Sequence, residues 1–156
     1  QAMARYLLDH QQWVAGKRVL DFGAGSGLAG IAALMAGASS VTAAEIDPVA
    51  SCAIAGNAAA NCVSVTSIEA DLVGGANLGW DVVLAADVCY EGPAAARILA
   101  WLRQLAGQGV VILMGDPGRT YFPKSGLEKL ISYAVATTTE LEDTDVRNTS
   151  VWRLTA

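Results

Sequence analysis

Three alternate glycines follow a carboxylate in the segment Asp21-Phe22-Gly23-Ala24-Gly25-Ser26-Gly27. Glycines without a Cβ let the backbone come close to a ligand, and the segment stands between an apolar run and an Ala/Leu-rich stretch, as a strand-to-helix turn does. The loop is therefore expected to contact a ligand. A tight turn that binds nothing is the alternative interpretation.

The same loop also fits the dinucleotide pattern G-x-G-x-x-G. Gly25, Gly27 and Gly30 occupy its glycine positions, and Glu45 stands twenty residues beyond Gly25, near where a dinucleotide site places its ribose-binding acid. Taken alone, the loop leaves NAD and S-adenosylmethionine as open alternatives.

Three features favour S-adenosylmethionine. Asp21 would repel a pyrophosphate but attract the ammonium group of a methionine. Asp71 and Leu72 offer a hydrogen-bond acceptor for an adenine amino group and an apolar side chain for its face. The two β-rich runs that close the chain are not part of a dinucleotide-binding repeat. Glu45 would then accept hydrogen bonds from both ribose hydroxyls; the alternative is a solvated acid at a strand end. Asp47 is equally suited to ligand contact and to the N-cap of a helix.

Asp87-Val88-Cys89-Tyr90 is the second segment with the residue types for chemistry. Asp87 would accept a hydrogen bond from an acceptor amine and orient its lone pair, with Tyr90 beside it; an N-cap and a packed aromatic residue are the alternative. His10 is expected to be solvated or to cap a helix, and the four tryptophans to pack rather than form a cage. One histidine and three unclustered cysteines indicate no metal site.

Alternating β-rich and Ala/Leu-rich runs would position these residues. We expect strands at 18–22, 41–44, 64–70, 81–86 and 109–114, helices at 28–35, 48–61 and 93–106, and so five βα units. Beyond these, an amphipathic helix is expected at 125–134 and an antiparallel pair of strands at 136–141 and 149–154. The predicted fold is α/β: a Rossmann-like three-layer sandwich with a mostly parallel seven-stranded sheet that ends in an antiparallel hairpin. The strand-end acids would meet along one edge of this sheet.

Composition restricts the class of protein. The 156 residues suit one domain, residues 1–156, and the start at Gln1 rather than methionine leads us to expect a missing N-terminal segment. A net charge of −5 without a Lys/Arg run argues against nucleic acid as a partner. The apolar stretches are too short to cross a membrane, and three cysteines without CxxC spacing suit reduced, small hydrophobic residues in the cytoplasm.

With these motifs together, the chain resembles the class I, seven-β-strand, S-adenosylmethionine-dependent methyltransferases. The resemblance rests on Val19 to Ala33, Ala44 to Pro48, Asp71-Leu72 and a D-x-x-Y signature at Asp87 to Tyr90. Within the branch that carries this signature, the segments 115–121 and 149–154 look most like the lysine methyltransferases of the electron transfer flavoprotein β subunit, a group also named nicotinamide N-methyltransferase-like.

The resemblance implies an enzyme that transfers a methyl group from S-adenosyl-L-methionine to a lysine side chain of a protein, with the electron transfer flavoprotein β subunit favoured, or to a small amine such as nicotinamide. A non-catalytic nucleotide-binding module is the alternative from another class. Asp87 and Tyr90 would form the acceptor site. The expected cofactor-binding residues are Asp21, Gly23, Ala24, Gly25, Gly27, Glu45, Ile46, Asp71 and Leu72.

Overall fold

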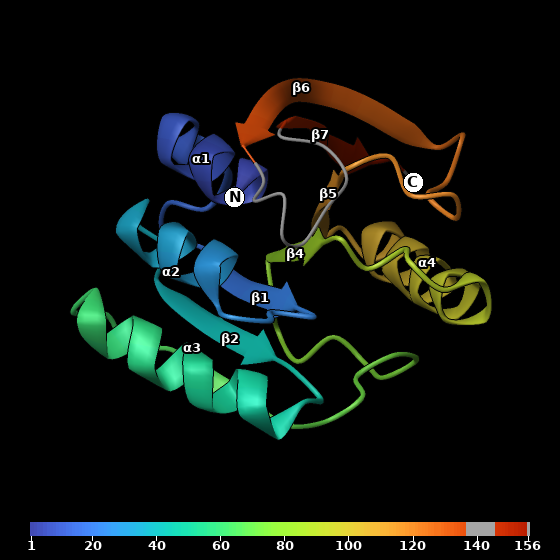
Figure 1. Ribbon diagram of the computed structural model, residues 1–156. Coiled ribbons are helices and arrows are strands. Elements are labelled where there is room, and N and C mark those ends of the chain that lie inside the picture. The colour runs from blue at the N-terminus through green and yellow to red at the C-terminus, as the bar shows by residue number, and fades with distance from the viewer. Residues whose placement is uncertain (137–145, 156) are drawn as a thin grey trace.

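A seven-stranded sheet in the order β3-β2-β1-β4-β5-β7-β6 forms the middle of the protein. The computed structural model describes residues 1–136 and 146–155 (Figure 1). The strands are β1 (Arg18–Phe22), β2 (Ser40–Ala44), β3 (Thr66–Ile68), β4 (Val82–Ala86), β5 (Val111–Asp116), β6 (Leu127–Ala136) and β7 (Val146–Leu154). The helices are α1 (Ala2–Asp9), the 3-10 turn η1 (Gln11–Trp13), α2 (Leu28–Met35), α3 (Pro48–Ala60) and α4 (Gly92–Gly107).

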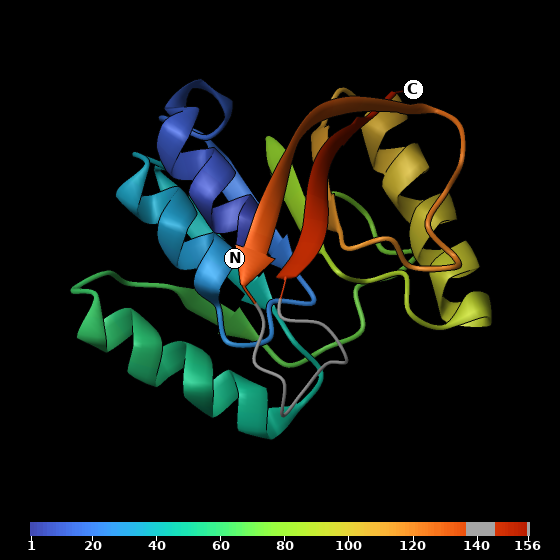
Figure 2. The ribbon, with the colours of Figure 1, turned by 45° about the horizontal axis from the view of Figure 1, so that its top comes forward.

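Helices on both faces of the sheet complete three layers, as predicted. Alternate residues of β1 and β4 point to opposite faces, so Val19 and Val82 pack toward α1 and α2, whereas Leu20 and Val83 pack toward α4. Figures 1 and 2 show α1 and α2 on one face, α3 beside α2, and α4 on the opposite face. Burial on both faces explains why these parallel strands are nearly continuous apolar runs.

The first five strands pair in parallel, and β5, β7 and β6 pair antiparallel, which confirms the predicted sheet. The expectation of five βα units is wrong in its helices. Helices follow β1, β2 and β4, but residues 69–81 connect β3 to β4 without one. Gly74, Gly75 and Gly79, together with the polar Asn77, give this segment loop chemistry rather than helix propensity.

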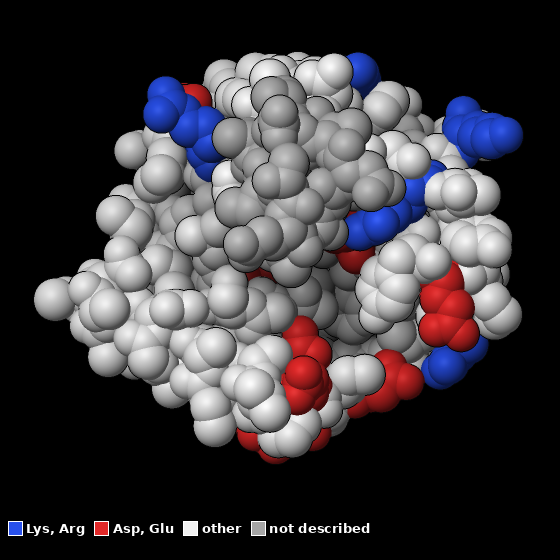
Figure 3. Space-filling view, in the orientation of Figure 1, with Lys and Arg blue, Asp and Glu red and all other residues white. Residues whose placement is uncertain are grey.

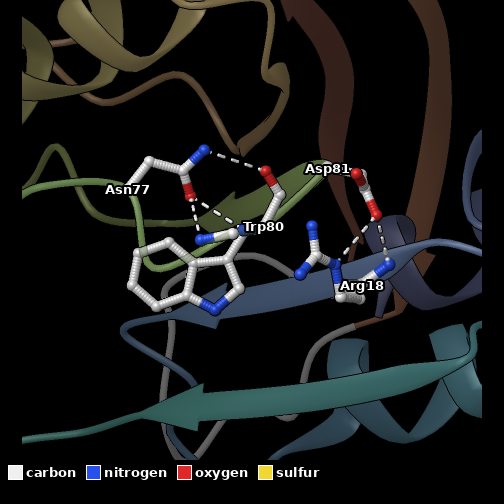
Figure 4. Close-up of polar contacts among 5 residues, drawn as sticks. Arg18, Asn77, Trp80 and Asp81 are labelled. Atoms are coloured by element: carbon white, nitrogen blue, oxygen red, sulfur yellow. Dashed lines mark hydrogen bonds and ion pairs between the residues drawn. The ribbon is translucent and has the colours of Figure 1, made fainter.

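Asn77 fixes the end of that loop next to the sheet. Its side-chain oxygen accepts hydrogen bonds from the backbone N–H groups of Gly79 and Trp80, and its side-chain nitrogen donates to the Trp80 carbonyl at 3.1 Å (Figure 4). One residue later, Asp81 accepts a 2.8 Å hydrogen bond from the Arg18 backbone N–H. The starts of β1 and β4 are thereby aligned, which sets where both strands end.

The predicted helix at 125–134 is wrong, because this segment forms most of β6. Ile131, Tyr133 and Val135 alternate in the manner of a strand and pack toward the α1 face, whereas Leu127 packs toward α4. A register shift between Lys129 and Ile131 marks a β-bulge, which changes the phase of the alternation. The apolar residues of this segment are therefore spaced as they would be in an amphipathic helix, which explains the wrong prediction.

The closing hairpin is therefore β6 with β7, and Ser132 and Ser150 pair across it at 2.8 Å between their hydroxyl oxygens. The predicted strand at 149–154 is confirmed and begins earlier, at Val146. Of the strand predicted at 136–141, residues 137–141 lie outside the described residues. Within the described ranges, every helix is too short or too polar to cross a bilayer.

Candidate functional site

A cavity of about 390 Å³ opens where the strand order reverses, at the carboxyl ends of β1 and β4. Open α/β sheets bind their ligands at this position. In the space-filling view of Figure 3, acidic side chains gather around the hollow in the lower half of the face and basic side chains border it from the upper right. The cavity is lined by Phe22, Gly23, Ala44, Glu45, Ile46, Ala70, Asp71, Val73, Asp87, Val88, Tyr90, Glu91, Ala94, Arg97 and Ile98.

The glycine loop lies at the edge of this cavity in a conformation that requires glycine. Gly23, Gly25 and Gly27 have φ angles of 64°, 54° and 79°, in the left-handed region. A Cβ on Gly23 would come within 3.1 Å of Val88, and one on Gly27 within 3.2 Å of Ile54. Of the loop's predicted ligand residues, only Gly23 lines the cavity. The roles of Ala24, Gly25 and Gly27 toward a ligand stay predictions.

Asp21 faces away from the cavity. Its carboxylate lies on the α2 face of β1, is 2% exposed, and accepts a 2.7 Å hydrogen bond from the Gly30 backbone N–H. Burial raises its pKa to about 7, the Gly30 hydrogen bond opposes this shift, and the negative charge of Glu45 adds to it. In this structure Asp21 holds helix α2 against the end of β1. Contact with a methionine ammonium stays a prediction.

Gly30→Ala is expected to destabilise the protein by about 1–3 kcal/mol. The added Cβ would lie 2.9 Å from Val41 Cγ1 and 3.0 Å from the Asp21 Oδ2 that accepts the Gly30 hydrogen bond. Urea unfolding measures the change. The matched control is Gly56→Ala on α3, where no atom lies within 4 Å, and there alanine should stabilise the helix by about 0.5–1 kcal/mol. Equal effects of the two changes would contradict the packing described for Gly30.

The raised pKa of Asp21 predicts a pH dependence of stability. Because the folded state keeps the proton up to about pH 7 while an ordinary aspartate loses it near 3.8, the folded state binds more protons in between. The free energy of unfolding contributed by this group therefore falls as pH rises from about 4 to about 7, then levels off. Asp21→Asn removes this loss, so the variant should gain stability relative to the unchanged protein as pH rises. Urea unfolding at pH 5 and pH 8 tests this, and a constant difference would contradict it.

Glu45 at the end of β2 joins the cavity to the glycine loop. Its Oε2 accepts from the Gly25 N–H at 2.8 Å, and its Oε1 accepts from Ile46 and Asp47 N–H groups at 2.8 and 3.1 Å. Three backbone donors fix this carboxylate in one orientation, and Oε2 keeps a lone-pair site for a ligand hydroxyl. Asp47 is the N-cap of α3, accepting from Val49 N–H at 2.9 Å, so the capping interpretation is confirmed.

Asp71 lines the same cavity in an exposed position. Its Oδ1 accepts from the Val73 N–H at 3.0 Å, and its Oδ2 is 3.4 Å from the Arg97 guanidinium of α4. Leu72 packs into the core on the α4 face, while Val73 and Ile98 supply the apolar lining. Val73, but not Leu72, lines the cavity, and contact of Asp71 and Leu72 with an adenine stays a prediction.

Asp87 and Tyr90 also line the cavity, as their position after β4 predicts. Asp87 has a φ of 56°, which aspartate tolerates better than most residues. Its two carboxylate oxygens accept from Nε and Nη2 of Arg119, each at 2.7 Å. Tyr90 is 67% exposed, so the part of the cavity beside Asp87 and Tyr90, which we call the acceptor end, opens to solvent.

Sequence reasoning missed Arg119 and Arg97, and also the apolar wall. Both arginines lie outside the acidic strand-end positions that indicate a ligand site, and no sequence spacing links Arg119 to Asp87 across 32 residues. The apolar wall could have been predicted from the alternation of side chains along β1. Side chains two residues apart in a strand point to the same face of the sheet. Phe22 therefore lies on the α4 face with Leu20, whereas Asp21 lies on the other face with Val19.

The histidine, two of the tryptophans and the cysteines lie outside the cavity. His10 is the C-cap residue of α1, and its ring packs on Tyr6 at 4.5 Å between centroids. Trp80 and Trp101 are buried in the core, which confirms packing for these two. Cys52 and Cys62 are exposed rather than buried hydrophobic residues, whereas Cys89 is buried. Within residues 1–136 and 146–155, no three side chains of His, Cys, Asp or Glu lie together in a group that could hold a metal ion.

Comparisons with known proteins agree with this architecture. Residues 2–90 match the family described as "Ribosomal protein L11 methyltransferase (PrmA)". The electron transfer flavoprotein beta subunit lysine methyltransferase of Xenopus laevis is 37% identical over 97% of this chain and 64% of its own length. The protein of the same name from Homo sapiens is 34% identical over 97% of this chain and 60% of its own length. The chain thus spans less than two thirds of these relatives.

A solved structure shows the same fold. Magnesium protoporphyrin IX methyltransferase (ChlM) from Synechocystis PCC 6803, with bound SAM, superimposes with a TM-score of 0.68. Its sequence identity is 15%, and the match covers 99% of this chain and 77% of that protein. At this identity the likeness supports the fold assignment alone.

Proposed function

The chain belongs to the ribosomal protein L11 methyltransferase (PrmA) family, and from this premise we propose that it binds S-adenosylmethionine and methylates a lysine side chain of a protein. The observation that carries the proposal is the single cavity at the β1/β4 switch. Glu45, Asp71, Asp87 and Tyr90 all line it. A nucleoside site and an acceptor site thus share one space.

The lining residues suit S-adenosylmethionine. Glu45 offers a fixed carboxylate for ribose hydroxyls and Asp71 an acceptor for an amino group, while Phe22, Val73 and Ile98 provide apolar walls for a purine. Carboxylates would repel the pyrophosphate of NAD. Calorimetric titration with S-adenosylhomocysteine and, separately, with NAD tests this assignment. Saturable binding of S-adenosylhomocysteine alone supports it, and binding of NAD alone would return the loop to its dinucleotide interpretation.

Bound S-adenosylmethionine supplies an electrophilic methyl group, so that the N–C bond forms as the C–S bond breaks and its electron pair stays on sulfur. The protein's part is to hold the amine in line with that bond. Asp87 accepts a hydrogen bond from the amine and aims its lone pair. Since only a neutral amine can attack, the proton must leave to water before the transfer.

A protein is the favoured acceptor because the acceptor end of the cavity is open. Tyr90 is largely exposed and the Asp87 side chain is half exposed, which suits a side chain reaching in from a protein surface. A small heteroaromatic amine such as nicotinamide would need a more enclosed pocket. The names of the two relatives support the electron transfer flavoprotein β subunit as the substrate.

The cellular setting is part of the same proposal. A net charge of −5 is unfavourable for binding a phosphate backbone, so nucleic acid is not expected as a substrate. Free cysteines, two of them exposed, suit a reducing compartment such as the cytoplasm. Localisation of a tagged full-length protein tests the compartment.

A further inference from the structure

Arg119 is the residue at the acceptor end that the proposed function has not yet used. Its Nε and Nη2 each donate a 2.7 Å hydrogen bond to a different oxygen of Asp87, which is the two-pronged arrangement that a guanidinium forms with a carboxylate. Both side chains remain partly exposed. A fixed positive charge therefore lies against the carboxylate that would receive the acceptor amine.

Both members of this ion pair are tied to the ends of β4 and β5. Oδ2 of Asp116 accepts from the N–H groups of Gly118 and Arg119 at 2.6 and 3.0 Å, which fixes the turn that carries Arg119. Asp116 is 4% exposed. On the other side, the Asp87 N–H donates to the Gly115 carbonyl at 2.7 Å. The pair is held by backbone contacts at each end rather than by two freely rotating surface side chains.

Among the residues that the structure describes, the other ionisable groups near Asp87 do not supply an equivalent cation. Burial raises the pKa of Asp116, and burial raises the pKa of the Cys89 thiol to about 11, so that thiol is neutral. The other ionisable groups that line the same cavity are Glu45, Asp71, Tyr90, Glu91 and Arg97. Asp116 and Lys124 line a separate hollow together with Arg119, and Cys89 is buried. Among these, negative charge predominates close to the acceptor position.

A surplus of negative charge is unfavourable for the chemistry. A lysine has an ordinary pKa of about 10.4, and a carboxylate beside it favours the ammonium form, which cannot attack a methyl group. Each oxygen of Asp87 uses one lone-pair site for Arg119 and keeps another for the amine. Asp87 can therefore still orient the acceptor while its charge is compensated.

We propose that Arg119 is a positioning residue that holds Asp87 in place and, through its fixed charge, favours the neutral form of the acceptor amine. This inference rests on the proposed lysine methylation. It predicts that Arg119 affects the shape of the pH profile of kcat as well as the magnitude of kcat. A cation beside a second amine is a known means of lowering an amine pKa in active sites.

The test is the pH profile of kcat for Arg119→Gln, with the full-length protein and the electron transfer flavoprotein β subunit. The profile of kcat is used because it reports groups in the enzyme–substrate complex. We expect the acidic limb to move to higher pH by about 1 unit. Arg119→Lys keeps the positive charge but loses the paired hydrogen bonds of the guanidinium. It should return the acidic limb of the kcat profile to its original pH while kcat itself stays lowered. Arg5→Gln, which breaks the Arg5–Asp9 pair on α1, is the matched control and should leave the profile unchanged.

Each outcome decides the matter. S-adenosylhomocysteine titration of every variant establishes that the fold and cofactor site persist. A loss of kcat by the same factor at every pH in Arg119→Gln would overturn the inference and leave the proposed function standing. An unchanged protein that transfers no methyl group to any lysine would overturn both.

Discussion

Asp87→Asn lowers kcat for methyl transfer by about 100-fold while S-adenosylhomocysteine still binds with little change: this is the expected result for a residue that aligns the acceptor amine. Asparagine is the informative replacement because the backbone of Asp87 has a φ of 56°, which asparagine tolerates and alanine does not. The amide keeps the size of the side chain but loses its charge, and its NH₂ group cannot pair with the Arg119 guanidinium.

Steady-state methylation assays and calorimetric titration measure these two quantities. Asp9→Asn removes a carboxylate that pairs with an arginine on α1, far from the cavity, and serves as the matched control. Normal turnover in Asp87→Asn would show that the acceptor site lies elsewhere. Loss of cofactor binding along with turnover would instead make Asp87 part of the cofactor site.

Glu45→Ala is expected to raise the Kd for S-adenosylhomocysteine by at least about 10-fold. One ribose hydrogen bond to the free site on Oε2 of this charged carboxylate contributes about 1.5–3 kcal/mol, and about 1.4 kcal/mol corresponds to a tenfold change in Kd. The substitution also removes the acceptor of the Gly25, Ile46 and Asp47 N–H groups, so the glycine loop loses its link to the end of β2.

The control for Glu45→Ala is Glu69→Gln, which neutralises an exposed carboxylate after β3 that does not line the cavity. Titration calorimetry gives both dissociation constants, and thermal unfolding without ligand checks that the loop change has not unfolded the protein. An equal, small effect of the two substitutions would indicate that Glu45 acts only through net charge and not as a ribose ligand.

The α/β part of the fold was predictable because its physics is local. Parallel strands buried on both faces are apolar throughout, and helices such as Leu28–Met35 and Pro48–Ala60 have clear starts at a glycine turn and a proline. The segment 127–136 was not predictable in the same way. Its bulge after Lys129 arises from pairing with β7, and single-sequence periodicity does not report that pairing.

The candidate site was predictable in its location but not in its contacts. Strand ends in a parallel sheet meet at one edge, which brings Glu45, Asp71 and Asp87 to one cavity. The direction of Asp21 followed from strand alternation and was overlooked. The Asp87–Arg119 pair depends on a turn fixed by Asp116, which is a tertiary contact that residue spacing does not encode.

Mass spectrometry of the electron transfer flavoprotein β subunit, after incubation with S-adenosylmethionine and the full-length protein, tests whether the protein methylates lysine, with nicotinamide offered in a parallel reaction. We expect whole methyl increments on lysine residues of the β subunit, no product from nicotinamide, and a strongly slowed reaction with Asp87→Asn. Methylated nicotinamide beside an unmodified β subunit would contradict the protein-lysine assignment. No transfer to either acceptor, despite saturable S-adenosylhomocysteine binding, would favour a non-catalytic binding module.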